Sequence, residues 1–134
     1  MSGEPILGKR PPQKYDYRLF AWPIFLALRE WAQRVADEEA AAVYLVGSAM
    51  HTAVPRDVDV AVVLPRAAFE QRFGAIPQPG TEAMQAYVLA IRDKTVDQYI
   101  SAQRAVGFGV LVDLRFTPDD WWADKPRMRL APLP

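Results

Sequence analysis

The sequence predicts an α/β fold of the α+β type, a small mixed sheet with helices on one face. Three short, β-branched apolar runs predict its strands: residues 43–46, 57–64 and 110–116. Two longer stretches with helical spacing, 16–41 and 81–104, predict helices that cover the apolar face of the sheet. The 134 residues, of which 51% are hydrophobic and 24% charged, fit a single folded domain.

The first helix is expected within residues 16–41. Ile24, Leu28 and Val35 belong to one apolar stripe at i, i+4 and i+11, and Pro23 fits the first turn of the helix. Three acidic residues, 37–39, crowd the last turn, where the helix dipole disfavours anions. We therefore expect the helix to end before the strand that begins at residue 43.

The second long helix is expected as one element over residues 81–104. Thr81 followed by Glu82 is typical of a helix start. One apolar stripe runs along the segment and comprises Met84, Tyr87, Val88, Ile91, Thr95, Tyr99 and Ile100. Before it, residues 66–73 predict a short helix that Gly74 ends.

Two aspartates open the strand at 57–64. Side chains alternate along a strand, so Asp57 and Asp59 share one face, and the opposite face is wholly apolar. In the strand at 110–116 the same alternation places Asp113 opposite an apolar face. The sequence therefore predicts three carboxylates on one side of the sheet.

The strand at 43–46 runs into Gly47 and Ser48. Glycine permits a close backbone approach, and serine caps helix N-termini. Residues 48–52 are expected to form a short helix before the next strand.

The two ends of the chain are rich in proline and basic residues. We expect residues 1–15 to form a flexible basic arm, residues 16–122 the folded domain, and residues 123–134 a basic tail. Neither end carries a periodic apolar stripe, so residues 1–12 and 125–134 are expected to be dispensable for folding. The first residues also lack the apolar segment of a signal peptide, which favours the cytoplasm.

Composition excludes several classes of function. The sequence has no cysteine and a single histidine, so disulfides, thiolate zinc sites and histidine-based metal sites are excluded. Neither a dinucleotide-binding fingerprint nor a P-loop lysine is present. The net charge of zero gives no basic field that would favour nucleic acid, and no apolar run is long enough for a membrane span.

Carboxylates that stand side by side at the start of a buried strand are unfavourable unless a cation lies between them. Hard cations such as Mg²⁺ need only a few carboxylate oxygens in addition to substrate phosphates. Asp57, Asp59 and Asp113 are therefore candidate metal ligands. The alternative is that Asp-x-Asp is an ordinary turn sequence. Arg115, on the face of Asp113, can pair with that aspartate or contact a triphosphate.

A strand ending in Gly47-Ser48, a short helix, a strand opening with Asp57 and Asp59, and a later strand carrying Asp113 together resemble the nucleotidyltransferase superfamily that includes DNA polymerase beta. The chain looks most like the minimal, single-domain members. The resemblance implies metal-dependent transfer of a nucleoside monophosphate from a nucleoside triphosphate to a hydroxyl acceptor.

In this resemblance the three aspartates bind Mg²⁺ (or Mn²⁺) and are catalytic. Gly47, Ser48 and Arg115 contact the triphosphate, for which we expect ATP. A protein partner or an associated subunit is the expected acceptor, because the chain has no added domain to hold another. Only residues 49–56 separate Ser48 from the aspartates, and Ala49, Met50, His51 and Thr52 stand where the family commonly has Arg and Gly after the Gly-Ser. That short link favours a rival reading, a non-catalytic module with the same fold that serves binding or regulation.

Overall fold

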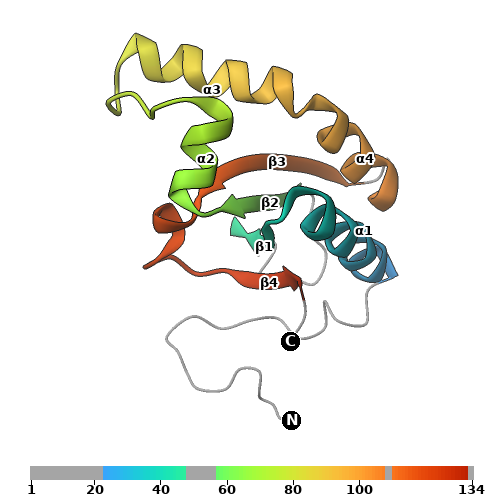
Figure 1. Cartoon of the computed structure of the whole chain (residues 1–134). Coiled ribbons are helices and arrows are strands. Elements are labelled where there is room, and N and C mark those ends of the chain that lie inside the picture. The colour runs from blue at the N-terminus through green and yellow to red at the C-terminus, as the bar shows by residue number, and fades with distance from the viewer. Residues whose placement is uncertain (1–22, 48–56, 108–109, 133–134) are drawn as a thin grey trace.

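The computed structural model describes residues 23–47, 57–107 and 110–132. Figure 1 shows the elements in chain order. They are α1 (Pro23–Glu39), β1 (Ala42–Val46), β2 (Asp57–Leu64), α2 (Arg66–Phe73), α3 (Glu82–Lys94), α4 (Val96–Val106), β3 (Leu111–Pro118), the 3₁₀ helix η4 (Asp119–Trp122) and β4 (Met128–Ala131). Within the described ranges, none of the helices has both the length and the apolar character needed to cross a bilayer.

The strands form one mixed sheet in the order β3-β2-β1-β4. β2 and β3 pair in parallel, whereas β1 pairs antiparallel with both β2 and β4. Parallel neighbours need a long crossover, which the segment containing α2, α3 and α4 supplies between β2 and β3. The predicted α+β fold with a small mixed sheet is confirmed.

The main core lies between one face of the sheet and the helices. Val58, Val60 and Val62 of β2 are each at most 1% exposed and belong to the same cluster as Phe25 and Leu28 of α1. Each such side chain contributes about 1.5–3 kcal/mol when it leaves water. The alternation that the sequence predicts for β2 therefore holds, and the aspartates of this strand lie on the opposite face.

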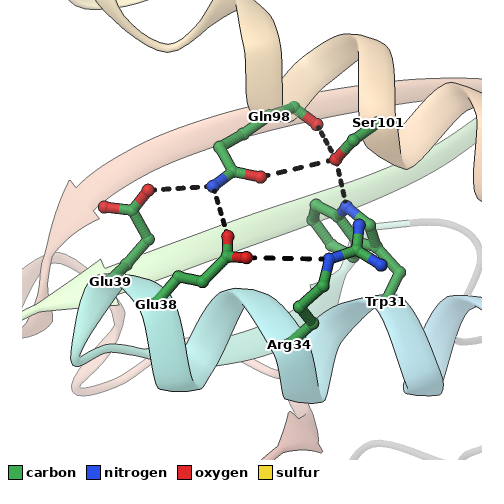
Figure 2. Close-up of polar contacts among 6 residues, drawn as sticks. All are labelled: Trp31, Arg34, Glu38, Glu39, Gln98 and Ser101. Carbon is green, nitrogen blue, oxygen red and sulfur yellow. Dashed lines mark hydrogen bonds and ion pairs between the residues drawn. The ribbon is translucent and has the colours of Figure 1, made fainter.

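A layer of polar contacts joins α1 to α4 above this core (Figure 2). Trp31 Nε1 donates a hydrogen bond of 2.7 Å to Ser101 Oγ. Gln98 Nε2 donates to carboxylate oxygens of Glu38, at 3.2 Å, and Glu39, at 2.9 Å. These bonds orient α4 on α1. They also stabilise the acidic residues in the last turn of α1, where the helix dipole disfavours negative charge.

The prediction of a single helix over 81–104 is wrong, because the segment forms two helices, α3 and α4, that meet at Thr95. The backbone there leaves the helical region (φ −116°, ψ 14°), and the Thr95 hydroxyl donates to the carbonyl oxygen of Ile91 at 2.8 Å. A threonine hydroxyl can satisfy a backbone carbonyl locally, which competes with continued helix. Its side chain is buried at the break.

The buried residues of α4 differ from the predicted apolar stripe. Tyr99 and Ile100 belong to that stripe but are 38% and 42% exposed, whereas α4 buries Ala102 and Val106. Ala102 and Val106 follow Ile91 at i+11 and i+15 and so share its helical face, whereas Ile100, at i+9, lies on the opposite face. The N-terminus of α3 is as predicted, with Thr81 Oγ1 accepting from Met84 N at 3.1 Å.

The C-terminal tail expected over 123–134 also requires correction. Met128–Ala131 forms β4, which pairs with β1, and Leu130 and Ala131 are 1% and 0% exposed. Four residues are too few for a recognisable alternation of apolar and polar side chains. They form a strand because their backbone pairs with the edge of β1. Residues 1–22 and 48–56, and with them the arm and the short helix predicted at 48–52, lie outside the described residues.

Candidate functional site

Asp59 and Asp113 lie directly opposite each other on neighbouring strands. The parallel register of β2 and β3 pairs Asp59 with Asp113, and it pairs Asp57 with Leu111. Facing residues on adjacent strands have backbones about 4.8 Å apart. Both aspartates alternate with core residues, so both side chains leave the sheet on the face opposite the main core. Asp57 starts the same strand two residues earlier and is exposed.

Gly47 lies against the carboxylate of Asp59. It follows β1 with a φ of +75°, a conformation that residues with a side chain rarely adopt. A Cβ at this position would lie 3.3 Å from Asp59 Cγ and closer still to Oδ2. The sequence predicts that another group approaches the Gly47 backbone closely. In the described chain that group is the Asp59 carboxylate.

The pKa of Asp59 is raised above its ordinary value. Burial is the largest cause, followed by the negative charge of Asp113; the guanidinium of Arg115 opposes the shift, and Asp57 adds a further increase. The three predicted aspartates thus share one electrostatic environment. The negative charges repel one another, and a cation between them would relieve that repulsion.

Two arginines flank Asp113. Arg115 Nη2 lies 3.3 Å from Asp113 Oδ2, and Arg92 Nη2 lies 3.9 Å from Asp113 Oδ1. Both arginine side chains are more than half exposed, so neither pair contributes much stability. The sequence offered two roles for Arg115, and the structure places it in the ion pair. Arg92 was missed, because its distance along the chain from the aspartates leaves no local signal.

A cavity of about 190 Å³ lies at the site, and its lining includes Gly47, Asp59, Asp113, Arg115 and Trp122 but neither Asp57 nor Arg92. The indole of Trp122 forms one wall, and its Nε1 donates to Thr117 Oγ1 at 2.7 Å. The volume is smaller than that of a typical drug-sized pocket. It suits a hydrated ion and part of a phosphate chain better than a whole nucleotide.

Asp59 and Asp113, with Asp57 beside them, offer the carboxylate oxygens that Mg²⁺ or Mn²⁺ accepts, and their mutual repulsion favours a bound cation. The described residues contain no group of three His, Cys, Asp or Glu side chains already gathered around one point. Ser48 lies outside the described residues. The argument that a metal ion fits this site therefore depends on Asp59 and Asp113, which face each other on adjacent strands.

Comparison of the chain with protein-family models, curated proteins and solved structures finds no match. The resemblance to nucleotidyltransferases thus depends on the residues of the chain itself.

Proposed function

We propose that the protein is a metal-dependent nucleotidyltransferase that transfers a nucleoside monophosphate from a nucleoside triphosphate, ATP in the first instance, to a hydroxyl acceptor. One observation carries the proposal: Asp59 and Asp113 stand in register on adjacent parallel strands, next to the glycine that ends β1. A hydroxyl on a partner protein or associated subunit is the proposed acceptor.

Each residue has a separate part in this reaction. Asp57, Asp59 and Asp113 would hold Mg²⁺ or Mn²⁺, which supplies positive charge to the phosphates and to the entering and leaving oxygens. Asp113 would lie on the side of the attacking hydroxyl. Arg115 would exchange its contact with Asp113 for one with the triphosphate, because a guanidinium binds phosphate oxygens well. Gly47 leaves room for Asp59 to keep its position.

A second candidate function is a non-catalytic module that keeps this fold and serves binding or regulation. The ion pairs from Arg92 and Arg115 favour it, since they already offset the charge of Asp113 without a metal. The short link at 49–56 points the same way.

The test is transfer of label from α-labelled ATP, with Mg²⁺ or Mn²⁺, to candidate partner proteins. Asp113→Asn should abolish transfer and keep much of the nucleotide affinity, because a ligand that acts mainly in the transition state is lost. Asp59→Asn should weaken both. Asp93→Asn, an exposed aspartate on α3, is the matched control and should leave transfer unchanged.

Melting curves with and without metal and ATP separate the two functions. Stabilisation by the metal with ATP but no labelled acceptor would support the non-catalytic module. If metal with ATP does not stabilise the protein and no acceptor is labelled, the enzyme is excluded.

A further inference from the structure

Among the described strands, β3 is the last one on its side of the sheet. The side chain of Gln103 closes the first part of its outer edge. Gln103 Nε2 donates to the carbonyl oxygen of Val110 at 2.6 Å, and Oε1 accepts from Val112 N at 3.0 Å. These bonds identify which backbone groups point away from β2. Because alternate residues of a strand point their backbone groups the same way, those of Leu114 and Phe116 also point outward.

The outward backbone groups of Leu114 and Phe116 have no hydrogen-bond partner among the described residues. Their side chains, in contrast, are 6% and 4% exposed and anchored in the core. A rigid strand with unpaired donors and acceptors is a template for one more strand. Gln103 limits that template to the second half of β3.

A cavity of about 260 Å³ runs beside this free stretch, between β3 and α3. Tyr87, Val88 and Ile91 line it from the helix, and Leu114 and Phe116 line it from the strand. α3 buries only Ile91 and so leaves an apolar groove at the edge of the sheet. Figure 1 shows α3 on the outer side of β3.

The groove is also positively charged. Arg92 and Arg115 both line it, and both reach the single carboxylate of Asp113. The residues that line the cavity include no Asp or Glu, and both arginine side chains are mostly exposed. An incoming carboxylate would find them accessible.

We propose that this groove binds an extended, acidic segment of a partner protein, which adds to the sheet as a fifth strand beside β3. Its backbone pairs with Leu114 and Phe116, its apolar side chains enter the cavity, and its carboxylates bind Arg92 and Arg115. Strand addition supplies affinity through the backbone, while the cavity and the arginines select the sequence. Of the residues that line this groove, Arg115 also lines the 190 Å³ cavity.

The probe is a blocked heptapeptide, Thr-Val-Glu-Val-Glu-Val-Thr, titrated into the full chain and followed by backbone amide NMR. Saturable binding should slow hydrogen exchange at the amides of Leu114 and Phe116. N-methylation of the peptide residues that face β3 should weaken binding about fivefold or more, because hydrogen bonds are lost. N-methylation of the alternate residues should have little effect.

Two pairs of variants test the selectivity of the groove. Arg92→Gln should lower affinity about threefold to fivefold, the range for a partly exposed ion pair, whereas Lys94→Gln should not. Val88→Glu places a carboxylate in the groove and should block binding, whereas Leu89→Glu, one residue along the exposed helix, should not.

Several results would overturn the proposal. These are an absence of saturable binding, equal binding of the peptide with Lys in place of Glu, and equal effects of both N-methylation patterns. Concentration-dependent shifts of the Leu114 and Phe116 amides without peptide would identify a second copy of the chain as the occupant instead. The outcome is independent of nucleotidyl transfer, since the peptide experiment contains neither metal nor nucleotide.

Discussion

At the scale of single residues, the contact between Gly47 and Asp59 matters most for the candidate site. The backbone at Gly47 has a positive φ, and the space where a side chain would stand is taken by a carboxylate. Two separate costs therefore oppose any replacement. One is the backbone strain of a positive φ. The other is the steric clash between the new side chain and Asp59, a proposed metal ligand.

Gly47→Ala and Gly80→Ala separate these costs. Gly80 also has a positive φ, +79°, but open space around it. Both variants should lose about 1–2 kcal/mol in the free energy of unfolding from backbone strain. Gly47→Ala should lose about 1–3 kcal/mol more from overpacking, and should also lose the proposed metal-dependent transfer. Denaturant titration measures the difference, and equal losses would show that Asp59 moves away freely.

The raised pKa of Asp59 predicts how stability depends on pH. A carboxyl whose pKa is higher in the folded state destabilises the fold when charged, and this penalty fades as pH falls through the raised pKa toward the ordinary value of 3.8. Without divalent metal, Asp59→Asn should therefore melt on the order of a few degrees higher at neutral pH. The gain should disappear at acid pH. A lower melting temperature at neutral pH would mean that attraction to Arg115 outweighs burial and repulsion.

At the scale of elements, β4 shows that backbone pairing with a neighbouring strand determines the secondary structure of a short segment. Leu130 is fully buried against the helices, whereas Arg129, beside it, is exposed and donates to the Tyr44 hydroxyl at 3.2 Å. The strand therefore completes both the sheet and the core. We therefore expect the fold to need this strand, contrary to the sequence prediction for residues 125–134.

Leu130→Ala should cost about 2–5 kcal/mol in the free energy of unfolding, because it leaves a cavity in the core. Arg129→Ala should cost less than about 1 kcal/mol, since its contacts are exposed. Thermal and denaturant unfolding measure both. If Leu130→Ala behaved like Arg129→Ala, β4 would not be an integral part of the folded domain.

At the scale of the whole molecule, contacts between distant parts of the chain set the arrangement. The long crossover places β3 beside β2, and the bond from Trp31 to Ser101 joins two residues that are 70 apart in the sequence. Both contacts bring together segments that have no local reason to meet. The candidate site therefore depends on the fold being complete.

A double-mutant cycle tests the link between α1 and α4. Trp31→Phe removes the donor together with part of a buried ring system, and Ser101→Ala removes the acceptor. Ser101→Ala should cost about 1 kcal/mol and Trp31→Phe more, because it also leaves a cavity. The coupling energy should be about 1 kcal/mol, because one hydrogen bond is shared. Gln33→Ala, on an exposed part of α1, should combine additively with Ser101→Ala. Additivity in both cycles would show that the bond does not join the helices.

Local patterns in the sequence predicted the parts of the fold that depend on neighbouring residues. Alternation in 57–64 predicted β2 and its two faces, and Gly74 correctly marked the end of α2. The same alternation placed Asp59 and Asp113 on one side of the sheet. These features follow from backbone geometry, which the sequence determines over a few residues.

Only the tertiary structure decided the rest. Arg92 reaches Asp113 because α3 lies along the edge of the sheet, and residues 128–131 form a strand because β1 has a free edge to pair with. The long helix breaks at Thr95, where a buried hydroxyl bonds back to Ile91 and α4 turns onto α1. Each outcome depends on a surface that exists only after the other elements have packed, and no local pattern in the sequence records such a surface.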